Sequence, residues 1–328
     1  MIEKDILIIG GGPIGLACAI EAQNAGLSYV VVEKGALVNS LFHYPLYMTF
    51  FSTADRLEIG NIPFLCVDPK PGRKEAIEYY RGVTANKKLN IHLYEKIESV
   101  SKEQDFFIST SSLHTYKTSK VVVATGFYDI PVFLNVKGED LSKVRHYYSE
   151  PHEYAFQKVT VVGASNSAVD AALEIYRKGG HVTMVIRHGE IGKRVKYWVK
   201  PDIENRISEG SIKAFFNSEV DEIKPKQVVI KTPDGLVEIE NDFVLAMTGY
   251  RPNFEMLCSF GVQLSDDGKF YPQYNPDTME TNVSGLYLAG VVVGGMDTHL
   301  WFIENSRIHA TLIMQHIVSQ KNTCNLEQ

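Results

Sequence analysis

The sequence contains no C-x-x-C pair, because its four cysteines, Cys18, Cys66, Cys258 and Cys324, are far apart in the chain. This spacing excludes a zinc ribbon and a local redox disulfide formed by neighbouring cysteines. In a reducing compartment, isolated cysteines are most simply single buried or surface thiols. No Ser/His/Asp or metal-ligand constellation is recognisable either, so any demanding chemistry is expected to come from a bound cofactor.

Long hydrophobic runs are also lacking. The longest run outside the first strand, at residues 286–293, includes a glycine and falls well short of the ~20 residues that span a bilayer. At the N-terminus, Glu3 and Asp5 stand where a secretory signal would carry positive charge, and three glycines interrupt the apolar run. We therefore expect a cytoplasmic protein that has no membrane partner.

Positive charge is not in excess, since the formal net charge is -6 and the pI is near 6.0. A nucleic-acid partner is therefore not expected. The 328 residues are enough for two hydrophobic cores of ordinary size. Low-complexity segments and Pro/Gly/Ser-rich linkers are absent from the sequence, which favours nested domains over domains joined in series.

Two stretches share the pattern of an apolar β-branched run, a glycine turn, an Ala-rich helix and a second apolar run. They cover residues 5–35 and 158–189. Runs such as 6–9 and 29–32 fit parallel strands buried on both faces, and glycines follow each expected helix. The sequence therefore predicts an α/β fold with two nested, doubly wound, Rossmann-like dinucleotide-binding domains.

Two further apolar runs end in Thr-Gly, at residues 121–126 and 243–249. We interpret them as strands that mark where the chain leaves the first domain and returns to it. The predicted division is residues 1–126 plus 248–328 for a discontinuous first domain, and residues 127–247 for an inserted second domain.

The first glycine turn, Gly10–Gly15, has the G-x-G-x-x-G pattern between an expected strand and an expected helix. Gly10 permits the tight turn, Gly12 lets a pyrophosphate approach the backbone, and Gly15 lets the helix pack on the strand. The helix N-terminus offers N–H groups and a positive dipole end to the phosphates. Glu33 ends the second strand, where a carboxylate accepts hydrogen bonds from an adenosine ribose. We expect this domain to bind FAD.

The second glycine turn, 163–168, is a degenerate copy with Ser165 and Ala168 at the later glycine positions. Alignment of Gly35 with Gly189 places Arg187 opposite Glu33. A guanidinium there suits the 2′-phosphate of NADPH, which it can bind bidentately. The nearby His188, Lys193, Arg194 and Lys196 either add to this phosphate site or belong to a solvated basic loop.

Aromatic residues that follow the first βαβ stretch form a weaker set of candidates. His43, Tyr44 and the run 49–52 either stack on a flavin ring or pack in a core loop. Trp301 and Phe302, which precede the last expected helix, either cover the flavin pocket or pack in the core. Cys18, on the first helix, is interpreted as a small buried hydrophobic residue.

Together these motifs resemble the bacillithiol disulfide reductase (YpdA-like) family of thioredoxin-reductase-like FAD/NADPH flavoproteins, over nearly the whole chain. The matching segments are Gly10–Gly15, Glu33–Gly35, Thr49–Ser52, Ile59–Phe64, Ala124–Gly126 with Tyr128, Asn166–Ala168, Asp170–Ala172, Lys196 with Trp198, Thr281–Asn282, Ala289–Val291 and Phe302–Asn305. The resemblance implies an oligomeric enzyme that contains FAD and uses NADPH.

The motifs and the resemblance together give a set of expected cofactor-binding residues. For FAD these are Gly10, Gly12, Pro13, Ile14, Gly15, Glu33, Lys34, Tyr44, Phe50, Ala124, Thr125, Gly126, Gly290 and Val291. For NADPH they are Gly163, Ser165, Asn166, Ser167, Arg187, His188 and Lys193.

The chain departs from its relatives at three places. It lacks the C-x-x-C of true thioredoxin reductases, and Ile14 stands where members of this branch often have a reactive cysteine. Val291 replaces the Asp that binds the flavin ribityl chain in the wider group, as is usual in this branch.

The expected function is hydride transfer from NADPH to flavin, followed by reduction of a low-molecular-weight disulfide or a small redox protein. A ferredoxin/flavodoxin–NADP reductase is the first alternative and is favoured by the missing cysteine, although the chain has only a short polar tail at 319–328. A flavin monooxygenase and a nucleotide-binding redox sensor are further alternatives.

Overall fold

The computed structural model describes residues 1–326, and side-chain surroundings are described as far as residue 321. Cys324 and the end of the tail lie outside the residues whose side chains are described. The chain forms two compact units. The first contains Met1–His43, Thr49–Ile130 and the chain from Tyr250 onward, and the second contains Tyr44–Met48 and Pro131–Gly249.

These boundaries differ in detail from the predicted division at residues 126 and 248. Residues 127–130 belong to the first unit, and residues 248–249 belong to the second. Residues 44–48 also join the second unit, where the Leu46 N–H donates to the Ser149 carbonyl oxygen at 2.8 Å. At the two crossings the chain forms a pair of short strands, β7 (Ile130–Pro131) and β16 (Tyr250–Arg251).

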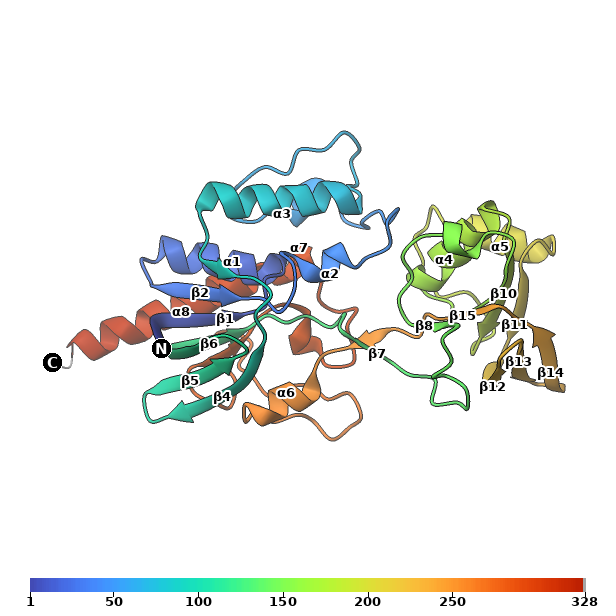
Figure 1. Cartoon of the computed structure of the whole chain (residues 1–328). Coiled ribbons are helices and arrows are strands. Elements are labelled where there is room, and N and C mark those ends of the chain that lie inside the picture. The colour runs from blue at the N-terminus through green and yellow to red at the C-terminus, as the bar shows by residue number, and fades with distance from the viewer. Residues whose placement is uncertain (327–328) are drawn as a thin grey trace. The chain divides into compact units, whose positions relative to one another are not determined.

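The first unit is built on a seven-stranded sheet in the order β3-β2-β1-β6-β5-β4, with β17 paired to β6 (Figure 1). Strand β6 divides the sheet into two parts. Its second half pairs in parallel with β17, and its first half pairs antiparallel with β5. The strands are β1 (Ile2–Ile9), β2 (Tyr29–Val32), β3 (Ile91–His92), β4 (Ile97–Glu103), β5 (Phe106–Ser111), β6 (Thr115–Val123) and β17 (Leu286–Leu288).

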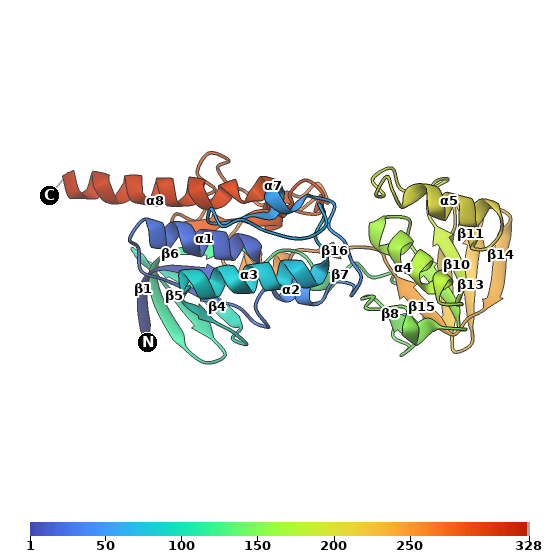
Figure 2. The ribbon, with the colours of Figure 1, turned by 90° about the horizontal axis from the view of Figure 1, so that it is seen from above.

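Helix α1 is the central helix of this unit and packs against α8, α3 and β2 (Figure 2). It starts at Pro13, a favoured first helical residue, and residues 14–20 and Ala22 are buried because their side chains are small or apolar. The helices are α1 (Pro13–Asn24), α2 (Asn39–Phe42), α3 (Arg73–Lys87), α6 (Phe254–Ser259), α7 (Ile303–Ser306) and α8 (Ile308–Leu326), with short 3₁₀ turns η1 (Ala54–Leu57) and η3 (Gly290–Gly294).

The second unit has a five-stranded parallel sheet in the order β11-β10-β9-β15-β8 and a separate three-stranded antiparallel sheet, β12-β13-β14. The helices are α4 (Asn166–Arg177) and α5 (Lys200–Ser208), with a 3₁₀ turn η2 (His152–Tyr154). The strands are β8 (Val144–Arg145), β9 (Lys158–Val162), β10 (His181–Ile186), β11 (Lys213–Phe216), β12 (Glu219–Lys224), β13 (Gln227–Thr232), β14 (Gly235–Glu240) and β15 (Phe243–Ala246).

Two hydrophobic clusters hold this unit together. One joins α4 and α5 to the parallel sheet, and the other joins the parallel sheet to β12 and β13. The predicted α/β fold with two nested βαβ units is confirmed. None of the helices in the described part of the chain combines the length and the apolarity that a bilayer crossing requires.

Candidate functional site: two glycine loops

The first glycine loop connects β1 to α1, and the structure gives each of its glycines a different environment. Gly10 has φ +110°, and a Cβ there would lie 2.6 Å from the Ala124 carbonyl oxygen. A Cβ on Gly15 would lie 1.9 Å from the Gly10 carbonyl oxygen. At both positions the chain's own backbone leaves no room for a side chain, so only glycine fits. A Cβ on Gly12 would meet nothing within 4 Å, so the open space at Gly12 faces outward from the loop.

Glu33 follows β2 and is bound to the glycine loop through its carboxylate. It accepts hydrogen bonds from the Gly11 N–H at 2.7 Å and the Gly35 N–H at 2.9 Å. The side chain is buried, and burial raises its pKa against the opposing effect of these two bonds. Each carboxylate oxygen can accept more than one hydrogen bond, so Glu33 keeps acceptor capacity for a ligand.

A pocket lies where β1, β2 and β6 end, at the carboxyl edge of the sheet. Its lining combines predicted and unpredicted residues: Ile9, Gly10, Val32, Glu33, Lys34, Asn39, Ser40, Glu95, Lys96, Ile97, Thr125, Gly126, Phe127, Asp129, Arg251, Asn253 and Met256. Lys34 pairs with Asp129 at 2.7 Å in its wall. Ligands in open α/β sheets bind at this edge, and the structure brings Gly10, Glu33, Lys34, Thr125 and Gly126 together there.

Thr125 is the polar group of this pocket that the protein leaves unsatisfied. Its hydroxyl oxygen is buried and has no hydrogen-bond partner among the described residues. Buried hydroxyls are normally paired, since an unpaired one costs free energy. Thr125 is therefore suited to bind a ligand group.

Ile14 lies in the first turn of α1 and packs against Gly290, whose Cβ, if present, would be 3.4 Å from the Ile14 Cβ. The Gly290 N–H donates to Nδ1 of the buried His309 at 3.1 Å. Burial lowers the pKa of His309 to about 4, so the ring is neutral and accepts this bond. Sequence reasoning missed His309, which carries no motif. Val291 follows Gly290 in η3 and is partly buried.

The aromatic candidates are spread over different parts of the chain. Tyr44 belongs to the second unit, whereas Phe50 belongs to the first, where its N–H donates to the Pro71 carbonyl oxygen at 3.0 Å. Trp301 packs edge-on against His309 with ring centroids 4.6 Å apart, and Phe302 is exposed. Neither Tyr44 nor Phe50 lines the pocket described above.

The second glycine loop, between β9 and α4, repeats the geometry of the first. Gly163 has φ +127°, and a Cβ there would lie 2.6 Å from the Met247 carbonyl oxygen. Its N–H donates to the Val185 carbonyl oxygen at 3.0 Å, as the Gly10 N–H donates to Val32 at 2.9 Å. Ser165 and Ser167 are exposed around the start of α4, and Ser165 makes no side-chain cap. The N-terminus of α4 is thus open to an anion.

The strand register corrects the alignment of Arg187 with Glu33. Since Val185 is equivalent to Val32, the buried Ile186 is the counterpart of Glu33, and Arg187 is the counterpart of Lys34. A second backbone hydrogen bond supports this alignment. The Glu95 N–H donates to the Glu33 carbonyl oxygen, and the Ser218 N–H donates to the Ile186 carbonyl oxygen in the same way. The alignment of Gly35 with Gly189 was wrong by one residue, because the loops after the two strands differ in length before their glycines.

The basic loop after β10 contains both exposed and buried basic side chains. Arg187, His188 and Lys193 are exposed, and Lys193 lies 3.5 Å from Glu190. Lys196 is buried and pairs with Asp170 at 2.7 Å, so its charge is compensated inside the unit.

Asn166 connects this loop to α4. Its side-chain amide donates to the Arg194 carbonyl oxygen at 3.1 Å and accepts from the Lys196 N–H at 2.9 Å. The structure therefore gives Asn166 a role in positioning the loop.

The three cysteines with described side chains, Cys18, Cys66 and Cys258, are all free. Cys18 is fully buried on α1, and burial raises its pKa to about 12. A thiol with such a pKa is not nucleophilic at neutral pH. The interpretation of Cys18 as a small buried residue is confirmed.

Comparison with known proteins extends these observations to the whole chain. Residues 7–290 match the family Pyridine nucleotide-disulphide oxidoreductase. The chain is 41% identical over 324 residues to Bacilliredoxin reductase Bdr of Bacillus subtilis, covering 98% of this chain and 100% of that protein.

Two solved structures are similar over the full length. Bacillithiol Disulfide Reductase Bdr (YpdA) from Staphylococcus aureus has a TM-score of 0.95 at 38% identity, covering 98% of this chain and 100% of that chain. The protein of the same name from Bacillus cereus has a TM-score of 0.95 at 39% identity, covering 97% and 99%. The chain therefore belongs to the Bdr (YpdA) family of flavin oxidoreductases, within the pyridine nucleotide-disulphide oxidoreductases.

Proposed function

We propose that this protein binds FAD in its first unit and NADPH in its second, and that it reduces bacillithiol disulfide or a bacilliredoxin. The observation that carries the proposal is that the two glycine loops have equivalent backbone geometry, whereas the residue at the end of the second strand differs between the two units. The acceptor is taken from the names of the relatives, which are a bacilliredoxin reductase and two bacillithiol disulfide reductases.

The residues of the first unit fit FAD. The space at Gly12 and the uncapped N-terminus of α1 suit a pyrophosphate, to which helix N–H groups donate. Glu33, fixed by two backbone N–H groups, suits the ribose hydroxyls, and the unpartnered hydroxyl of Thr125 suits a polar group of the cofactor. When bound, FAD supplies the capacity to accept a hydride and to deliver two electrons to a disulfide.

The residues of the second unit fit NADPH better than NADH. Ile186, at the position of Glu33, provides no carboxylate for an unmodified ribose and none to repel a 2′-phosphate. Arg187 is exposed beside it and offers a planar fork of N–H donors to a phosphate. Asn166 holds the basic loop against α4, and Ser165 and Ser167 stand at the helix N-terminus.

The net reaction is NADPH, a proton and one disulfide giving NADP⁺ and two thiols. The nicotinamide carbon–hydrogen bond breaks, the sulfur–sulfur bond breaks, and two sulfur–hydrogen bonds form. With Ile14 in the first turn of α1 and Cys18 buried beside it, this unit presents no reactive thiol on α1. We therefore propose that the acceptor disulfide takes its electrons from the flavin without a thiol relay on α1.

An anaerobic reoxidation experiment tests the acceptor. The bound flavin is first bleached with NADPH, and its recovery is then followed after mixing with bacillithiol disulfide, an oxidised bacilliredoxin, ferredoxin, flavodoxin or oxygen. The proposal expects the fastest recovery with bacillithiol disulfide or bacilliredoxin. Fastest recovery with ferredoxin or flavodoxin would replace it with an NADP reductase function, and fastest recovery with oxygen would favour a monooxygenase. No bleaching by NADPH would leave a nucleotide-binding sensor.

Two wider properties belong to the same proposal. A disulfide-reducing enzyme that draws on NADPH is suited to the cytoplasm, where thiols are kept reduced. Assembly into a homo-oligomer is a prediction from the family resemblance. Light scattering on the FAD-containing protein tests it, and a mass of one chain at micromolar concentration would contradict it.

A further inference from the structure

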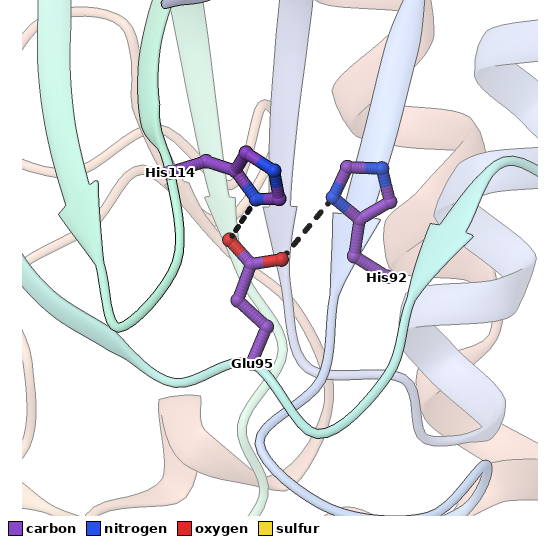
Figure 3. A group of neighbouring side chains, drawn as sticks. All are labelled: His92, Glu95 and His114. Atoms are coloured by element: carbon purple, nitrogen blue, oxygen red, sulfur yellow. Dashed lines mark hydrogen bonds and ion pairs between the residues drawn. The ribbon is translucent and has the colours of Figure 1, made fainter.

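Three side chains that are separated in sequence converge beside the first unit's pocket. His92 ends β3, Glu95 lies in the loop between β3 and β4, and His114 lies in the turn between β5 and β6. Figure 3 shows the two imidazole rings on either side of the Glu95 carboxylate. The fold brings them together, and their spacing in the sequence does not predict the cluster.

Both imidazoles direct the same type of nitrogen at the same carboxylate. Nδ1 of His114 lies 3.1 Å from one Glu95 oxygen, and Nδ1 of His92 lies 3.2 Å from the other. The three groups offer ligand atoms that all lie within 4.8 Å of one another. Zinc binds histidine nitrogen and carboxylate oxygen at about 2.0–2.2 Å in tetrahedral geometry, which places ligand atoms roughly 3.3 Å apart. The two separations between a histidine Nδ1 and a Glu95 oxygen are close to that value, and the third pair of ligand atoms, within 4.8 Å, would move closer together around the ion.

We propose that His92, Glu95 and His114 form a zinc-binding site, with the two Nδ1 atoms and one carboxylate oxygen as protein ligands. Two imidazoles and a carboxylate are ligands that suit Zn²⁺. The side chains of His92 and His114 are 29% and 46% exposed, so water has access to the fourth position.

The groups around Glu95 prepare it to act as an anionic ligand. The carboxylate is 1% exposed and accepts hydrogen bonds from the hydroxyls of Ser111 and Tyr116. These hydrogen bonds fix the position of the carboxylate between the two imidazoles. Hydrogen bonds of this kind orient metal ligands and are part of many sites.

Tyr116 also touches one of the histidines, since its hydroxyl lies 2.7 Å from His92 Nδ1. Zinc binding would replace the His92–Tyr116 contact and leave the Tyr116 bond to Glu95 in place.

Charge balance supports a cation at this cluster. In the described chain, the ion-pair partners of Glu95 are these two histidines, which carry charge only when protonated. A buried carboxylate is costly unless a positive charge compensates it. A divalent cation would supply that charge, and metal ligation requires the imidazoles to be neutral.

Zinc at this position would brace one wall of the pocket. The Glu95 N–H donates to the Glu33 carbonyl oxygen at 2.9 Å, and Glu95, Lys96 and Ile97 all line the pocket. The site itself depends only on the cluster and stands independently of the cofactors proposed above.

Zinc titration calorimetry on the untagged, FAD-containing protein tests the site, in a buffer that does not bind metal. We expect one Zn²⁺ per chain. His92→Gln and His114→Gln each keep an amide donor for Glu95 but lose the imidazole ligand, so each should weaken zinc binding at least tenfold. His152→Gln, an exposed histidine of the second unit, is the matched control and should bind zinc like the unaltered protein.

Two measurements keep the outcome decisive. Flavin content and circular dichroism establish that each variant is folded, and the partly exposed His114 is the position where replacement disturbs packing least. The titration is repeated with Cys66→Ser and Cys258→Ser to remove zinc bound by the other thiols. Absence of zinc binding in the Cys66→Ser/Cys258→Ser background, or equal binding by the His92→Gln/His114→Gln double variant, would overturn the proposal.

Discussion

Thr125 and Thr248 occupy equivalent positions in the two units, but only Thr248 donates its hydroxyl hydrogen to the chain. Each follows the residue whose carbonyl oxygen closes a glycine loop, Ala124 in the first unit and Met247 in the second. Thr248 donates to the Val132 carbonyl oxygen, whereas the Thr125 hydroxyl is buried without a partner among the described residues. The two strand-to-turn segments are alike in sequence, so the difference comes from the neighbouring chain, which supplies an acceptor for Thr248 and none for Thr125 among the described residues.

Thr125→Val is expected to change stability and cofactor affinity in opposite directions. Valine has nearly the same shape and removes the unsatisfied hydroxyl, so the FAD-free protein should be more stable by about 1 kcal/mol. Loss of a hydrogen bond to FAD should weaken its binding by about 1 kcal/mol, or roughly fivefold. Urea unfolding of the apoprotein and flavin-fluorescence titration measure the two effects.

Thr248→Val is the matched control. Its hydroxyl is already paired, so the substitution should destabilise the protein by about 1 kcal/mol and leave FAD affinity unchanged. Equal effects of the two substitutions on FAD binding would contradict the assignment of Thr125 to the cofactor.

The positions of the two glycine loops were predictable from sequence. The correspondence between the residues at the ends of the two second strands was not predicted correctly. Gly10 and Gly163 need positive φ beside a strand end, and the sequence shows them as glycines after apolar runs. The second-strand ends were aligned through Gly35 and Gly189, which lie in loops of different conformation. Glu33 and Ile186 both lie 23 residues after the first glycine of their loops, and counting from the glycines would have found them.

Arg187→Ala is expected to raise the KM for NADPH by about 10- to 100-fold and to change the KM for NADH little. The reason is loss of charge-assisted hydrogen bonds to the 2′-phosphate, each worth roughly 1.5–3 kcal/mol. Steady-state kinetics with both nucleotides measures the difference. Lys231→Ala removes a positive charge from an exposed position on β13 and is the control. Parallel increases in KM for both nucleotides would exclude the 2′-phosphate role.

Side-chain clusters built from distant segments could not be read from the sequence. His92, Glu95 and His114 come from a strand end, a loop and a hairpin turn, and no periodicity links them. His309 sits in a terminal helix that reads as ordinary core. Lys196 was grouped with the basic loop because it is near in sequence, although Asp170 on α4 neutralises it in the interior. Tertiary contacts decide all of these positions.

Ile14→Cys is expected to increase turnover of bacillithiol disulfide, because the substitution supplies the thiol that α1 lacks at this position. The site is suitable, since position 14 lies in the first turn of α1 against Gly290, and a thiol at a helix N-terminus has a lowered pKa. Loss of isoleucine packing should cost on the order of 1 kcal/mol of stability. NADPH consumption measures turnover, and Ile14→Ser controls for the smaller side chain. No change with cysteine, or an equal gain with serine, would count against a thiol relay at this position, and Cys18→Ala should leave turnover unchanged.

His309 gives the first unit a pH-dependent stability whose sign follows from its lowered pKa. Burial lowers the pKa of His309 from its ordinary 6.5 to about 4. Between these values the unfolded chain binds a proton that the folded chain does not. The stability contributed by the neutral His309 is therefore fully present above pH 6.5 and is lost as pH falls towards 4. From pH 7.5 to pH 5 the loss should be about 2 kcal/mol.

His309→Gln keeps an acceptor for the Gly290 N–H but does not titrate, so its stability should depend less on pH than that of the unaltered protein. Urea unfolding at pH 7.5 and pH 5 measures both proteins, with circular dichroism as the readout. His152→Gln, in the second unit, should keep the full pH dependence because that ring is exposed. If His309→Gln lost as much stability as the unaltered protein between these two pH values, the acid sensitivity would have to come from other groups. The neutral ring beside Gly290 would then be a packing feature without a role in the pH response.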